Sequence, residues 1–206
     1  MVVRALWILA AAAAGVSCDA PLRTRECPAS TTLDADRAAT ILRGLHAAAR
    51  EPILALGLRR SLAEALGSSD VVLCFGASAS ALIEDGPIVL DRSLTDAALS
   101  ARLGHLLLHR THAVPWTAED RGHCANRVAK AMRAEAVGLA AELELRRVLG
   151  AGDVFATSDL EREFFRAPQA DRVGVAERYL VAHPDGVAGV GASIASYRAR
   201  CRREGS

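Results

Sequence analysis

The chain has 206 residues, of which 51% are hydrophobic, and a formal net charge of +1. Its length suits one domain with a substantial core and is short for two. Its basic residues are scattered rather than gathered in one stripe, apart from the arginine-rich end at residues 198–203, so the composition argues against a nucleic-acid-binding protein.

The N-terminus has the pattern of a secretory signal. Arg4 precedes an apolar run at residues 5–16, which ends in small residues before Asp19. The run is too short to remain as a membrane-spanning anchor. Residues 15–18, Gly-Val-Ser-Cys, resemble a bacterial lipobox, so we expect lipidation at Cys18, with ordinary cleavage near Ala20 as the alternative. Either cut predicts an exported protein of the periplasm or cell envelope, and lipidation would tether it to a membrane.

The remaining cysteines agree with export. Cys27, Cys74, Cys124 and Cys201 are an even number, which in an oxidising compartment permits two disulfides in three possible pairings. A bond from Cys201 would tie down the last helix, and Cys124 lies just before a long helix that could receive it. No C-x-x-C pair is present, so we expect a structural role for all four rather than a metal or redox role.

The first half of the chain predicts two helices and then strands. Residues 19–33, rich in Pro, Thr, Ser and Arg, are interpreted as a tether. A helix with one buried stripe begins at Asp34, and after Pro52 a second helix runs to residues 67–70. Short apolar runs at residues 71–75 and 87–90 predict strands of a small sheet.

The second half is predicted to be helical. The capping residues Asp91, Ser93 and Thr95 precede a helix that Pro115 ends. A loop at residues 113–124 leads to a long helix that ends at Leu149, with Gly150 at its C-cap. Further helices are expected at residues 158–166, 170–182 and 187–201. The order predicts a single mainly helical α+β domain over residues 34–206, with a small two- or three-stranded sheet packed on several helices.

The residues with the clearest chemistry are His105 and His109. Four positions apart on a helix, their imidazoles lie on one face, where a metal ion could bridge them. The same spacing occurs in the zinc-peptidase motif H-E-x-x-H, in which the residue after the first histidine is the general base. Here that residue is Leu106. The chain therefore has the two histidine ligands of such a site without its base.

Zinc needs a further ligand from another element. His112 is a poor choice, because two helical turns separate it from His105 by roughly 10 Å. We expect Glu135 on the long helix, where the small residues Ala131 and Gly138, one turn to either side, would let another helix approach closely. The other glutamates that could serve are Glu119, Glu142 and Glu144.

This arrangement resembles the minimal gluzincin-type metallopeptidases, in which a strand precedes an H-E-x-x-H helix and a later helix supplies a glutamate ligand. The resemblance covers residues 71–149 and implies a zincin-like core with zinc held by His105, His109 and Glu135. Leu106 departs from the pattern. General base catalysis contributes a factor of roughly 10² to 10⁴, so we expect a non-catalytic protein that binds a metal or a protein or peptide partner without cleaving peptides.

Two alternatives stay open from the sequence. The first is an envelope scaffold or interaction protein that binds no metal, in which the histidines are packing residues and Glu135 is a solvated side chain paired with Arg133 or Arg146. The second is a zinc-dependent peptidase whose base is displaced, for example to Glu119. That base would have to lie within hydrogen-bond reach of a metal-bound water.

Overall fold

The computed structural model describes residues 26–67, 71–77, 81–82, 86–111, 124–151, 158–185 and 194–204. The signal segment with the expected lipidation site at Cys18, together with His112 and Glu119, lies outside the described residues. Among the described helices, none combines the length and apolar character that crossing a membrane requires.

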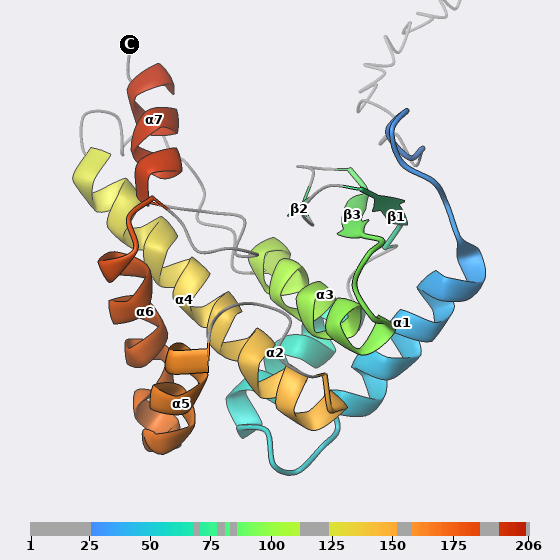
Figure 1. The fold of residues 1–206 in the computed structure, drawn as a ribbon, viewed down its shortest axis with the longest axis horizontal. Coiled ribbons are helices and arrows are strands. Elements are labelled where there is room, and N and C mark those ends of the chain that lie inside the picture. The colour runs from blue at the N-terminus through green and yellow to red at the C-terminus, as the bar shows by residue number, and fades with distance from the viewer. Residues whose placement is uncertain are drawn as a thin grey trace, which may run out of the picture.

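The described elements follow the predicted order of helices, a small sheet, and more helices (Figure 1). In chain order they are α1 (Ala35–Ala48), α2 (Leu56–Gly67), β1 (Leu73–Gly76), β2 (Ala81–Leu82), β3 (Ile88–Asp91), α3 (Asp96–Thr111), α4 (Cys124–Leu149), α5 (Ser158–Arg166), the 3-10 turn η2 (Gln169–Asp171), α6 (Arg172–Ala182) and α7 (Ile194–Glu204). The prediction of a mainly helical α+β fold is confirmed. Helix α6 begins slightly later than predicted, because the chain first makes the 3-10 turn after Pro168.

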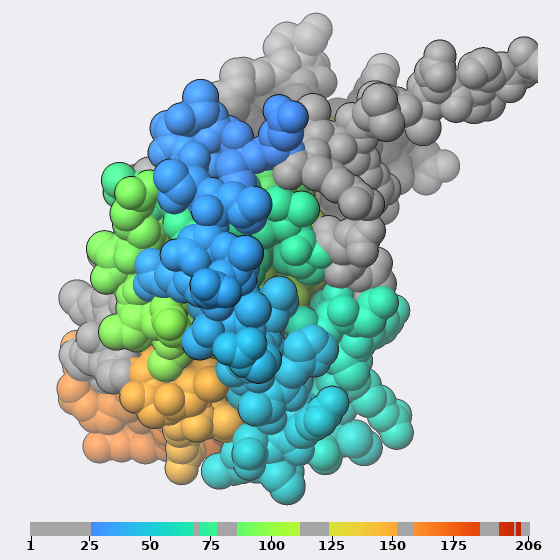
Figure 2. Space-filling model, turned by 90° about the vertical axis from the view of Figure 1, so that its right-hand side faces the viewer, coloured from blue at the N-terminus to red at the C-terminus, as the bar shows by residue number. Residues whose placement is uncertain are grey.

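Helix α1 begins where the capping pattern predicts. The Asp34 carboxylate accepts a hydrogen bond from the backbone N–H of Arg37 at 3.0 Å, which satisfies one of the free donors of the first turn. Ile41, Leu45 and Ala48 form its buried stripe. Figure 2 shows α1, in blue, lying across one face of the molecule.

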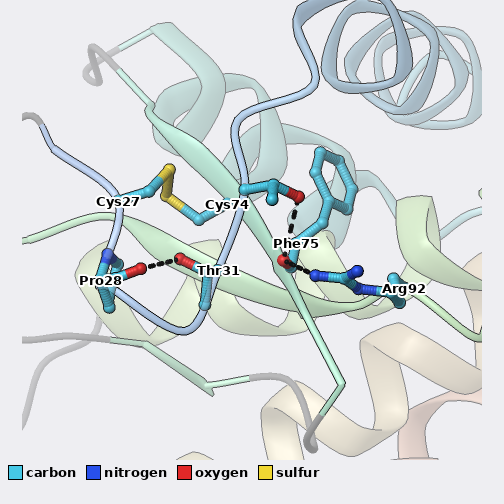
Figure 3. The surroundings of a disulfide bond; sticks show 7 residues. Cys27, Pro28, Thr31, Cys74, Phe75 and Arg92 are labelled. Atoms are coloured by element: carbon cyan, nitrogen blue, oxygen red, sulfur yellow. Dashed lines mark hydrogen bonds between the residues drawn. A yellow bond between two sulfur atoms is a disulfide. The ribbon is translucent and has the colours of Figure 1, made fainter.

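The sheet has the strand order β1-β3-β2, with β1 and β3 parallel and β2 antiparallel to β3. The chain before α1 is fastened to β1 at two points (Figure 3). Thr32 and Phe75 exchange backbone hydrogen bonds of 3.0 and 2.8 Å, and Cys27 forms a disulfide with Cys74. The described part of the expected tether, residues 26–33, is therefore attached to the sheet.

Two apolar clusters form the core, and α4 contributes to both. The first gathers residues of α1, α2, the sheet and α3, and includes Ala141 and Leu145 of α4. The second gathers residues of α4, α5, α6 and α7, and includes Met132 and Leu139 of α4. Because α4 is covered on opposite sides, several of its polar side chains are buried, and Glu135 is one of them.

The second disulfide joins Cys124, at the start of α4, to Cys201 on α7. The structure thus settles the pairing that the sequence left open and confirms the structural role expected for all four cysteines. Two disulfides are typical of proteins that fold outside the reducing cytoplasm.

Candidate metal centre

Helix α3 carries both histidines, and the His105 ring lies against Gly138 of α4. The Thr95 hydroxyl accepts a hydrogen bond from the backbone N–H of Ala98, and Asp96 lies in the first turn, so the N-terminus of the helix is capped. Leu103 and Leu107, which are fully buried, pack into the first cluster. His105 is only 2% exposed, whereas the His109 side chain is 20% exposed, so one imidazole is enclosed and the other borders solvent.

Helix α4 approaches α3 closely because it has a glycine at the contact. A Cβ atom on Gly138 would lie 2.4 Å from Cδ2 and 2.6 Å from Nε2 of His105. Only a residue without a side chain fits there. This close approach, expected from the small residues around Glu135, brings the Glu135 carboxylate to the two histidines.

Two imidazole nitrogens and the two carboxylate oxygens of Glu135 converge at this contact. Nε2 of His105 lies 2.9 Å from Nε2 of His109 and 3.3 Å from Oε2 of Glu135, and Nε2 of His109 lies 3.3 Å from Oε1 of Glu135. Two atoms bound to one tetrahedral zinc ion at about 2.0–2.1 Å lie about 3.3 Å apart. The two nitrogen–oxygen separations match that spacing, each with its own oxygen of Glu135, and the nitrogen–nitrogen separation is a few tenths of an ångström shorter. His105, His109 and Glu135 therefore form a group that could hold a metal ion.

The other nitrogen of His105 determines which ring atom faces this group. Nδ1 lies 2.9 Å from Oε2 of Glu142, so in the neutral ring Nδ1–H donates to the carboxylate and Nε2 keeps its lone pair. The Arg102 guanidinium lies 3.2 Å from the same oxygen, and both side chains are buried. Glu142 thus holds His105 in the tautomer that a metal ligand requires.

The electrostatics of the group favour bound positive charge. Burial alone would lower the pKa of His105, but its hydrogen bonds to Glu135 and Glu142 outweigh this and raise the pKa above the usual value of 6.5. Burial alone would raise the pKa of Glu135, but hydrogen bonds with His105 and His109 outweigh it and hold that carboxyl ionised, with its pKa well below the usual range. A cation, either a proton or a metal ion, is stabilised here.

A residue from the C-terminal helix completes the surroundings. The Tyr197 hydroxyl of α7 donates a hydrogen bond of 2.8 Å to Oε1 of Glu135. Tyr197 carries no local signal in the sequence, because 62 residues separate it from Glu135. Arg102 also carries no local signal that relates it to Glu142, because the two residues are on different helices. The position of Glu142, two helical turns after Glu135 on the same face of α4, is a signal that could have indicated its place beside His105.

The remaining sequence-predicted residues lie elsewhere. Glu142 contacts the far side of His105 instead of the ligand group, and Glu144 pairs with Arg172. Leu106 packs into the first apolar cluster. The alternative of a solvated Glu135 paired with Arg133 or Arg146 is wrong: Glu135 is 5% exposed, and those arginines pair with Glu177 and Glu161.

The donor set fits zinc. Two imidazole nitrogens and one carboxylate oxygen are ligands that zinc accepts, and the hydrogen-bonded second nitrogen of His105 is the usual support for such a histidine. Comparisons of the chain with protein-family models, with curated proteins and with solved structures gave no match. The assignment of this centre therefore depends on its residues and their geometry.

Proposed function

We propose that this protein is an exported, non-catalytic zinc-binding protein whose ligand set is similar to that of a metallopeptidase. The observation that carries the proposal is the convergence of three ligands at the contact between α3 and α4: the two imidazole nitrogens lie 2.9 Å apart, and each lies 3.3 Å from one oxygen of the Glu135 carboxylate. His105, His109 and Glu135 would hold the ion, which would supply a Lewis acid and a positive charge in a largely enclosed site.

The surroundings support a binding role rather than peptide cleavage. Leu106 stands where the general base of the zinc peptidases would be, is 7% exposed, and belongs to the first apolar cluster. The nearest glutamates along α4 are engaged away from the ligand group, Glu142 by His105 and Arg102 and Glu144 by Arg172. Loss of the base at position 106 would slow hydrolysis by roughly 10²- to 10⁴-fold.

The location proposed for this function is outside the cytoplasm. Two disulfides support export. The lipobox-like residues before Cys18 support a membrane tether, which would place the metal centre at the surface of the envelope.

The test is metal content and affinity. The protein, purified without a chelating tag, is stripped with EDTA, reconstituted with zinc and assayed by elemental analysis and by competition with a chromogenic chelator. We expect one zinc ion per chain, lost in His109→Ala and kept in His183→Ala, which removes an exposed histidine. His109 is the better target because its partial exposure limits the cost of truncation. Absence of zinc after reconstitution would refute the proposal.

One observation favours a second function. The raised pKa of His105 between two buried glutamates means that a proton can take the place of a metal ion and close the group as an ion-pair cluster. The protein would then be a metal-free envelope scaffold. This alternative predicts no zinc uptake and a wild-type stability that does not change when zinc is added.

A further inference from the structure

Helix α7 reaches the candidate metal centre through one side chain. The Tyr197 hydroxyl donates to Oε1 of Glu135, the oxygen that lies 3.3 Å from Nε2 of His109. The tyrosine ring packs against the second apolar cluster, so the position of the hydroxyl is determined by packing as well as by the hydrogen bond. We propose that Tyr197 is a positioning residue for the metal ligand Glu135, and that the Cys124–Cys201 disulfide holds it in place.

The disulfide and the tyrosine lie on matching faces of the two helices. Tyr197 and Cys201 are four positions apart, one turn along α7. Cys124 and Glu135 are eleven positions apart on α4, which is about three full turns and returns to the same face within roughly 20°. The later residue of α7 bonds the earlier residue of α4, so the two helices run antiparallel, as Figure 1 shows. Helix α7 is thus fastened to one face of α4 at two points.

The hydrogen bond determines how Glu135 presents its oxygens. A carboxylate turns broadly about its last torsion angle unless its oxygens have partners. Here the tyrosine hydroxyl fixes Oε1, which leaves Oε2 facing His105 at 3.3 Å and Oε1 within reach of His109. Hydrogen-bond partners of metal ligands are typically worth about 10- to 100-fold in metal affinity. The tyrosine hydroxyl is therefore expected to contribute within that range.

The disulfide then links metal affinity to oxidation. When the Cys124–Cys201 bond is reduced, α7 keeps only its noncovalent contacts with α4, and the population with Tyr197 on Glu135 decreases. The complete centre is therefore more populated in the oxidised protein than in the reduced one. The inference rests on the proposed zinc binding. It adds that Tyr197 and the Cys124–Cys201 disulfide make zinc binding stronger in an oxidising compartment.

The experiment compares two variants with two matched controls, using zinc affinity and the absorption spectrum of the cobalt-substituted protein. Tyr197→Phe removes only the hydroxyl; its control is Tyr179→Phe, since Tyr179 packs against the same cluster from α6. Cys124→Ala with Cys201→Ala removes the bond to α7; its control removes the Cys27–Cys74 bond, which fastens the N-terminal segment to the sheet.

We expect zinc binding about 10- to 100-fold weaker, with an altered cobalt spectrum, in Tyr197→Phe and in the Cys124/Cys201 variant, and wild-type behaviour in both controls. Combining the two changes should weaken binding no further than the stronger one alone, because both act through the same hydroxyl. Wild-type affinity and spectrum in Tyr197→Phe would overturn the inference, and this variant decides the matter even where loss of the disulfide impairs folding. Failure of the wild-type protein itself to bind zinc would instead refute the proposed function.

Discussion

Gly138→Ala is the substitution whose effect follows most directly from the structure. The new Cβ atom would lie 2.4 Å from Cδ2 and 2.6 Å from Nε2 of His105, well inside any normal contact. Restoring contact at about 3.5–4.0 Å requires the ring or the helix to move by roughly 1 Å or more. The His105 ring cannot move that far without losing its hydrogen bond of 2.9 Å to Glu142 or its contact with His109. The substitution therefore acts on the metal ligand itself.

The expected magnitudes separate stability from metal binding. Overpacking typically costs about 1–3 kcal/mol, and alanine in place of a helical glycine returns about 1 kcal/mol, so the free energy of unfolding should fall by no more than about 2 kcal/mol. Zinc affinity should fall further than after loss of a single outer hydrogen bond, which costs about 10- to 100-fold. Gly138→Ala should therefore stay folded and bind zinc at least about 100-fold more weakly.

Gly104→Ala is the matched control. Gly104 lies in the middle of α3, and its added Cβ would lie 2.4 Å from Cδ1 of Leu145, in the first apolar cluster and not against an imidazole. Urea unfolding and chelator competition should show a comparable loss of stability in the two variants, and a loss of zinc affinity only in Gly138→Ala. Wild-type zinc affinity in Gly138→Ala would refute the assignment of His105 as a ligand held at this contact.

Three further predictions concern the same centre. In the metal-free protein, the raised pKa of His105 contributes stability that is fully present below about pH 6.5 and is lost as the pH rises through the raised value. Zinc competes with that proton, so zinc should bind more tightly as the pH rises over the same interval. A zinc affinity that does not change between about pH 6 and 8 would contradict this. Glu142→Gln should lower the free energy of unfolding by about 3–5 kcal/mol, because the buried Arg102 and His105 lose their shared carboxylate, and an unchanged urea midpoint would argue against the ion pair. Leu106→Glu should not create a peptidase, because the new carboxylate would enter an apolar cluster and the lost leucine burial alone costs about 2 kcal/mol; release of fluorescent peptides from labelled casein by this variant would show that position 106 faces the metal after all.

Local patterns in the sequence predicted most of the helices, the strands β1 and β3, and the histidine pair, but not β2 or the 3-10 turn η2. Helical spacing of apolar residues, the Asp34 cap and the glycine after α4 predicted elements that the structure confirms, because caps and amphipathic stripes depend on residues within a few positions of each other. The same locality placed His105 and His109 on one helical face. Small residues around Glu135 correctly indicated where another helix would approach.

Only the tertiary structure decided what surrounds these residues. Three kinds of contact join segments that are far apart in the chain and share no local pattern. They are the two disulfides, the hydrogen bond between His105 and Glu142 across 37 positions, and the hydrogen bond from Tyr197 to Glu135 across 62 positions. The burial of Glu135 is of the same kind, since a single helix cannot reveal that neighbours cover it on opposite sides. Sequence periodicity gives the face of a helix on which a residue lies, whereas packing between distant segments determines which groups that face meets.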